Sequence, residues 1–119
     1  MKQLKIYEYG NCSTCKQALK FLDLKKVDYQ KIAITETPPS KAELKKMLAH
    51  YQGDLKKLFN TSGQVYREMK LGEKFDDLTE AQAIELLASN GKLIKRPFLL
   101  TGKAGLVGFK LDEWKKAFA

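Results

Sequence analysis

Two cysteines separated by two residues, Cys12 and Cys15, are the side chains of this sequence best suited to chemistry. They lie between a strand-like segment and a helix-like one, so the pair spans the first turn of the expected helix. At that spacing both sulfurs lie on one face, where they can form a disulfide or exchange with another one. The start of a helix also carries partial positive charge and unpaired N–H groups, which favour a thiolate. The pattern therefore predicts a reactive thiol pair.

Two other interpretations of the pair are weaker. Free cysteines are often buried and inert, but the start of a helix is an exposed place for them. A structural zinc ion usually needs four ligands, and the one histidine of the sequence, His50, lies far along the chain. We therefore expect no metal site.

Length and composition predict one domain over residues 1–119, because a chain of 119 residues that is 44% hydrophobic can bury a core. No apolar stretch approaches the length of a membrane span, and the N-terminus lacks a signal-peptide pattern. We therefore expect a cytoplasmic protein without a membrane partner. Thiols are kept reduced in that compartment, so a close cysteine pair indicates redox chemistry rather than a structural disulfide.

The chain is strongly basic, with a formal net charge of +8. Among its 22 basic residues the arginines are Arg67 and Arg96, and the others are lysines spread along the expected helices. Proteins that bind nucleic-acid phosphates usually favour arginine for its forked hydrogen bonding. We interpret the lysines as solvated helix surface, with a weak role in binding an acidic partner left open. No direct nucleic-acid partner is expected.

Alternating apolar residues predict four strands, at residues 4–9, 27–34, 97–101 and 104–109. A helix between the first two strands makes a β-α-β unit, which should be parallel with a right-handed crossover. A tight turn at Gly102-Lys103 joins the last two strands into an antiparallel hairpin.

Helix signals fill the rest of the chain. The first helix covers residues 13–25 with Ser13 or Thr14 as its cap, and a terminal helix covers residues 111–118. A helical insertion covers about residues 38–92. Its expected elements are a helix opened by the Ser40–Glu43 capping box, a short helical turn at 54–59, a short helix at 66–71, and a helix from Thr79 to Asn90-Gly91. This order predicts an α/β, thioredoxin-like fold: β-α-β, helical insertion, β-β-α, with a mixed four-stranded sheet flanked by helices.

Four segments together carry a family resemblance. They are the Cys12–Lys16 motif, the Phe59–Gly63 loop followed by Tyr66, the segment Leu93–Pro97 and the strand Gly105–Phe109. On these segments the chain resembles the arsenate reductase-like (ArsC/Spx) family of the thioredoxin fold over nearly its whole length. The resemblance implies that Cys12 is the nucleophile and that Arg96 precedes a cis proline, Pro97, facing it. Cys15 would then act as the resolving thiol.

The chain departs from the arsenate reductases of this family at most of their anion-binding positions. Those enzymes carry a histidine four residues before the nucleophile, an arginine four residues after it, and further arginines in the mid-chain loop and the last hairpin. Here these positions hold Glu8, Lys16, Asn60 and, approximately, Phe109 or Lys110. Arg96 alone matches. A carboxylate near a thiol disfavours its thiolate, so the departures favour a two-cysteine redox couple over oxyanion reduction.

The sequence therefore predicts a thiol–disulfide oxidoreductase, closest to the less characterised members with a CxxC pair. The expected catalytic residues are Cys12 and Cys15, and the expected substrate-binding residues are Arg96, Pro97, Lys16 and Asn60. No bound cofactor is required, and the electron donor would be glutathione, glutaredoxin or thioredoxin. Two alternatives stay open: a glutaredoxin-linked arsenate reductase, and an Spx-like redox-sensing regulator that binds RNA polymerase.

Overall fold

One of the two inner strands of the sheet leads to the cysteine pair. The computed structural model describes residues 4–10, 12–102 and 104–118. Its strands are β1 (Lys5–Glu8), β2 (Gln30–Ala33), β3 (Phe98–Leu100) and β4 (Gly105–Val107), in the order β2-β1-β3-β4. The β1–β2 pair is parallel, and the β1–β3 and β3–β4 pairs are antiparallel. The predicted mixed four-stranded sheet is therefore confirmed.

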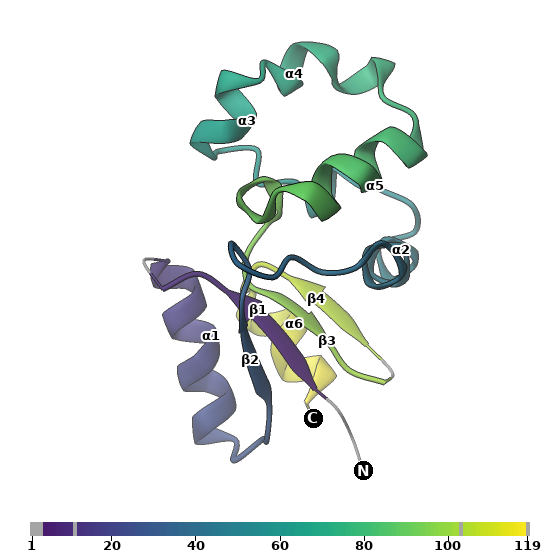
Figure 1. The fold of residues 1–119 in the computed structure, drawn as a ribbon. Helices are drawn as coiled ribbons and strands as arrows, with labels where there is room; N and C mark the ends of the chain where they lie inside the picture. Colours follow the sequence, from purple (N-terminus) through teal and green to yellow (C-terminus); the bar gives the residue numbers. More distant parts are fainter. Residues whose placement is uncertain (1–3, 11, 103, 119) are drawn as a thin grey trace.

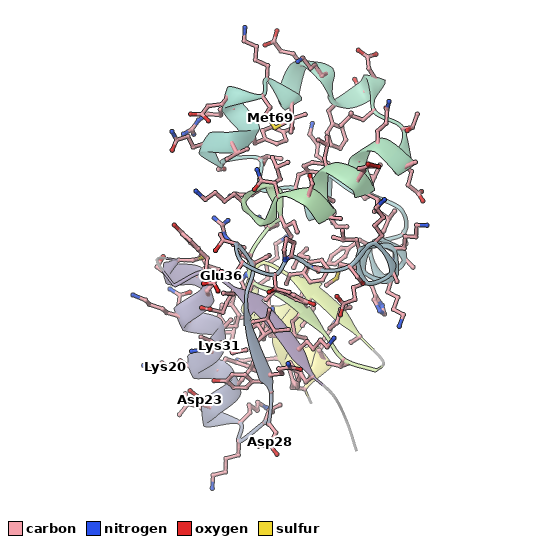
Figure 2. The ribbon with its side chains drawn as sticks, in the orientation of Figure 1. Lys20, Asp23, Asp28, Lys31, Glu36 and Met69 are labelled. Atoms are coloured by element: carbon pink, nitrogen blue, oxygen red, sulfur yellow. The ribbon has the colours of Figure 1, made fainter. Side chains whose placement is uncertain are left out.

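One face of the sheet is covered by α1 (Ser13–Leu24) and α6 (Leu111–Ala117) (Figure 1). The apolar side of α1 packs against the strands, and Ala18 and Leu22 are fully buried there. Lys20 and Asp23 project from its outer side into solvent (Figure 2). Trp114 of α6 is fully buried, and its indole N–H donates to the Gly108 carbonyl at 3.1 Å. These contacts fix the orientation of α1 and therefore of its N-terminus.

The helical insertion covers the other face of the sheet. Its long helices are α2 (Lys41–His50) and α5 (Glu80–Ser89), and its short ones are η1 (Leu55–Leu58), α3 (Gln64–Glu68), α4 (Leu71–Lys74), η2 (Phe75–Asp77) and η3 (Gly91–Leu93). The predicted Ser40–Glu43 capping box is present, with hydrogen bonds of 3.0 and 3.1 Å. Beyond α2 the short helices form an arm that extends from the sheet (Figure 1).

The structure corrects the sequence prediction at two places. The helix expected over residues 66–71 is instead two helices, α3 and α4, because Lys70 between them has a left-handed backbone with φ of +54°. The cap of α1 is Cys12 rather than Ser13 or Thr14. Lys103 of the predicted turn lies outside the described residues, but Thr101 N–H donates to the Ala104 carbonyl at 2.9 Å across that hairpin.

No helix in the described part of the chain is both long enough and apolar enough to span a membrane.

Candidate functional site

Cys12 lies at the junction of β1 and α1, where its backbone and its thiol both shape the start of the helix. Its N–H donates to the Tyr9 carbonyl at 3.0 Å, which turns the chain out of the strand. Its Sγ accepts a hydrogen bond from the Cys15 N–H at 3.3 Å, the role that an oxygen of serine or aspartate usually has at a helix start. The Cys12 side chain is half-buried, so its sulfur is fixed by the helix and still reachable.

Cys15 lies in a contrasting environment one turn further on. Its side chain is fully buried, and burial raises the pKa of its thiol to about 12. A backbone hydrogen bond with Tyr9 lowers that pKa, the interactions with Cys12 raise it, and the charge of Arg96 lowers it. Both cysteines are free thiols. The pair therefore combines one reachable sulfur with one protected and protonated sulfur.

Arg96 and Pro97 approach the cysteines from the segment before β3. The peptide bond between them is cis, as predicted. The Arg96 guanidinium carbon lies 4.9 Å from the centroid of the Tyr9 ring, a distance typical of a cation–π contact. Pro97 is buried, and its carbonyl accepts from the Gly108 N–H at 2.9 Å. Arg96 thus lies over the ring of Tyr9, whose carbonyl accepts the hydrogen bond from the Cys12 N–H.

A groove of about 290 Å³ brings the reachable thiol together with polar residues from three parts of the chain. Cys12, Asn60 and Arg96, all predicted from the sequence, line it. Of the other predicted residues, Cys15 and Pro97 are buried and do not line it. Lys16 is exposed in the first turn of α1 and is also absent from the lining.

Two lysines that the sequence prediction did not select also line this groove, Lys95 and Lys110. The Lys95 side chain passes close to Gly108, whose φ is +71°. A Cβ atom at Gly108 would lie 2.8 Å from the Lys95 Cε, so the absence of a side chain there leaves room for Lys95. The sequence contained an indication for each of these two lysines. Lys95 directly precedes Arg96, and Lys110 lies near the position where the family resemblance places an arginine. Together with Arg96 they give the groove three cationic side chains.

The position of Asn60 is set by a short attachment between the insertion and the segment before Arg96. Phe59 and Ile94 form an antiparallel bridge, the Asn60 N–H donates to the Leu93 carbonyl at 2.7 Å, and the Lys95 N–H donates to the Leu58 carbonyl at 2.8 Å. The same contacts hold Lys95 and Arg96 beside the insertion.

Other parts of the structure offer less to chemistry. A hollow of about 440 Å³ beside Lys5, Glu43 and His50 is larger but contains no cysteine. Within the described residues, no group of three or more histidine, cysteine, aspartate or glutamate side chains is arranged to hold a metal ion. The cysteine groove is therefore the candidate site.

Comparisons with known proteins identify the family of the chain. A family model described as the ArsC family matches residues 7–117. The chain belongs to the ArsC family. It is 46% identical over 116 residues to the uncharacterized protein YusI of Bacillus subtilis, covering 98% of each chain. It is 29% identical over 103 residues to the global transcriptional regulator Spx of Streptococcus mutans, covering 87% of this chain and 74% of Spx.

Solved structures of ArsC relatives have the same fold. An ArsC family related protein from Bacteroides fragilis superposes with a TM-score of 0.90 at 43% identity, covering 96% of each chain. A protein described as a possible arsenate reductase from Streptococcus mutans gives a TM-score of 0.87 at 38% identity, covering 97% of this chain and 99% of that one. The predicted family and fold class are thus confirmed.

Proposed function

We propose that this chain is a cytoplasmic thiol–disulfide oxidoreductase that uses Cys12 and Cys15 as a redox pair. The observation that carries the proposal is the asymmetry of the two thiols. Cys12 is reachable from the groove, whereas Cys15 is fully buried with a raised pKa. A nucleophile must reach its substrate, and a resolving thiol must wait unreacted until the first step is complete.

The reaction proceeds in two exchanges. In the first, the Cys12 thiolate attacks one sulfur of a substrate disulfide, forms a mixed disulfide and releases the other substrate thiolate. In the second, Cys15 loses its proton and attacks the Cys12 sulfur, which releases the remaining substrate thiolate. The substrate gains two electrons, and the protein is left with a Cys12–Cys15 disulfide. No bound cofactor takes part; glutathione, glutaredoxin or thioredoxin would return the two electrons.

The groove supplies binding for an anionic group near the substrate sulfur. Arg96, Lys95 and Lys110 provide positive charge, and Asn60 provides a neutral hydrogen-bonding group. Pro97 is buried and does not line the groove, so it would act by positioning Arg96 rather than by contacting the substrate. Lys16, exposed at the helix start, would contribute only long-range charge.

Trapping of the mixed disulfide tests this proposal. On incubation with glutathione disulfide, the Cys15→Ser variant should accumulate a glutathione adduct on Cys12, detected by mass spectrometry of the intact protein. The wild-type chain should instead lose two hydrogens as its own disulfide forms. The Cys12→Ser variant is the matched control and should remain unmodified. An adduct on Cys15 in that variant, or no reaction of the wild type, would contradict the proposal.

Arsenate reduction is the second candidate, favoured by the three cations that surround Cys12 in the groove. The 38% identity to a possible arsenate reductase also supports it. NADPH oxidation coupled through glutathione and glutaredoxin, in the presence of arsenate, measures this activity. Absence of turnover would remove the candidate without affecting disulfide exchange.

A redox-sensing regulator that binds RNA polymerase is the third candidate, favoured by the identity to Spx over 87% of this chain. In that case the Cys12–Cys15 disulfide would change the affinity for the polymerase. Capture of RNA polymerase by the reduced and by the oxidised protein tests it, and equal absence of binding in both states would exclude it.

A further inference from the structure

The cysteine groove continues into a second hollow that is strongly basic. This hollow, of about 180 Å³, lies toward η1 and shares Lys95, Val107 and Lys110 with the cysteine groove. It adds two further lysines, Lys56 and Lys57. We use the term basic groove for the two hollows together, whose cationic side chains are Arg96, Lys56, Lys57, Lys95 and Lys110.

The positive charge of the basic groove has little compensation within the protein. Glu113 is the one acidic residue that lines either hollow, and its carboxylate lies near the Tyr51 hydroxyl, whose pKa is raised by burial and by the Glu113 charge. The Tyr51 hydroxyl in turn accepts from the Val107 N–H at 3.0 Å. Among the described residues, the ion pairs are Lys5–Glu43 and Lys41–Glu85, so none involves a lysine of the basic groove.

Aromatic rings lie close to two of these lysines, and a glycine gives space to a third. The Lys57 ammonium lies 5.7 Å from the Tyr51 ring centroid, and the Lys56 ammonium lies 5.4 Å from that of Phe75. Gly108 provides the space through which Lys95 passes. The charges are therefore directed by the fold, although all four lysines are exposed.

The shape of the site favours an extended ligand. A third hollow of about 320 Å³, lined by Lys92 and Glu68 among others, shares Asn60 and Arg96 with the cysteine groove and contains none of the four lysines of the basic groove. Cys12 thus lines the middle hollow of three. A small thiol compound occupies one such hollow, whereas a polypeptide can lie across Cys12 and reach both neighbours.

We propose that the basic groove binds an acidic polypeptide segment, so that the disulfide attacked by Cys12 belongs to a protein with acidic residues on one side of its cysteine. This inference rests on the proposed thiol–disulfide function and adds the chemical class of its substrate. Carboxylates of the segment would lie against Lys56, Lys57, Lys95 and Lys110 while its cysteine lies over Cys12. Complementary charge of this kind accelerates encounter and selects among partners.

Peptides with an activated disulfide test the charge preference. Each peptide carries one cysteine joined to thionitrobenzoate, with four glutamates, four glutamines or four lysines on its N-terminal or its C-terminal side. Attack by Cys12 forms a bond to the peptide sulfur and releases the thionitrobenzoate anion, which is followed by its absorbance. At low salt the reduced protein should react at least about tenfold faster with one of the glutamate peptides than with its lysine counterpart. Added salt should reduce this ratio.

A pair of double variants separates the groove from the overall charge. Lys56→Gln/Lys57→Gln should lower the glutamate-to-glutamine rate ratio at least about threefold. Lys20→Gln/Lys31→Gln removes the same net charge at two exposed positions of α1 and β2 (Figure 2) and should keep the wild-type ratio.

Three results would overturn the inference. These are equal rates with glutamate and glutamine peptides, an equal loss of preference in both double variants, and the mixed disulfide of glutathione with thionitrobenzoate reacting as fast as the best glutamate peptide. If no peptide disulfide reacts, including the uncharged ones, the proposed thiol–disulfide function itself fails, and this inference fails with it.

Discussion

The sulfur of Cys12 accepts a hydrogen bond from the backbone N–H of Cys15, 3.3 Å away. The nucleophile predicted from the sequence is therefore also the cap of the helix that carries its partner. In the proposed reaction, the Cys12 sulfur would change from a hydrogen-bond acceptor at the helix start to one atom of a disulfide. The first turn of α1 and the redox state of Cys12 are thus coupled.

The two thiols should differ strongly in alkylation. In the folded, reduced protein, iodoacetamide should modify Cys12 and leave Cys15 unmodified, because Cys15 is fully buried and its pKa is raised to about 12. In denaturant both should react. Peptide mapping by mass spectrometry measures this order, with the Cys12→Ser variant as the control. Equal modification of both residues in the folded state would contradict the assigned asymmetry.

Cys15 should make stability depend on pH in the alkaline range. The folded protein keeps the Cys15 proton up to about pH 12, whereas an unfolded cysteine loses it near pH 8.5. Unfolding therefore releases a proton above that pH, and the free energy of unfolding falls as pH rises. The free energy of unfolding of the Cys15→Ala variant should fall less steeply with pH than that of the wild type, by up to about 1.4 kcal/mol per pH unit.

Urea unfolding at pH 7, 8.5 and 10 under reducing conditions measures these slopes. Leu22→Ala, another fully buried residue of α1, is the matched control. Leu22→Ala should lower the free energy of unfolding at every pH and leave its slope against pH as in the wild type. Parallel pH curves for wild type and Cys15→Ala would show that the thiol is not protected from ionisation.

Glu43 should contribute stability that is lost in acid. Burial raises the pKa of its carboxyl, but hydrogen bonds from the Ser40 N–H, the Tyr7 hydroxyl and the Lys5 ammonium outweigh it, so that the pKa is lowered overall. The Tyr7 hydroxyl donates at 2.7 Å and Lys5 Nζ lies at 3.2 Å. The ionised carboxylate thus stabilises the fold at neutral pH, and the contribution is lost as pH falls below about 4.3.

The Glu43→Gln variant should lose about 1–2 kcal/mol at pH 7, and the difference from wild type should shrink near pH 3. Glu85→Gln is the control, because its pair with Lys41 is 3.7 Å long and exposed, and it should change stability by less than about 0.5 kcal/mol. Chemical unfolding at both pH values compares them. A constant difference for Glu43→Gln across this range would contradict the expected role of its charge.

Arg96 should matter for anionic substrates more than Lys16 does. Arg96→Gln should slow reaction with an anionic aromatic disulfide about three- to tenfold and leave reaction with a neutral dialkyl disulfide nearly unchanged, since Arg96 lines the groove. Lys16→Gln should change both rates less than about twofold, because Lys16 does not line the groove. Stopped-flow measurement of the rates with both disulfides tests this difference between the two variants. Equal effects of the two substitutions would show that only the net charge of the protein acts.

The sequence was sufficient for the order of the elements because each element has a local signal. The Ser40–Glu43 box begins α2, the cysteine pair follows a strand, and Arg96-Pro97 precedes the hairpin. The split at Lys70 was not predictable, because a lysine with φ of +54° has no local signature. Its N–H donates to the Arg67 carbonyl, and its own carbonyl accepts from the Glu73 and Lys74 N–H groups that begin the next helix. The site was predicted in part. Its missing members, Lys95 and Lys110, are brought to Cys12 by tertiary contacts.

The bridge between Phe59 and Ile94 closes the chain into a loop that leaves and rejoins the fold at one place. Residues 60–93 between these two positions include Asn60 and the arm of short helices. The same segment contains α5, whose buried Ala83, Ile84 and Leu87 belong to one core with Leu44 and Met47 of α2. For protein engineering, a graft between the two anchors must therefore keep α5 and can replace only the short helices before it, with the cysteines and Arg96 left in their present frame.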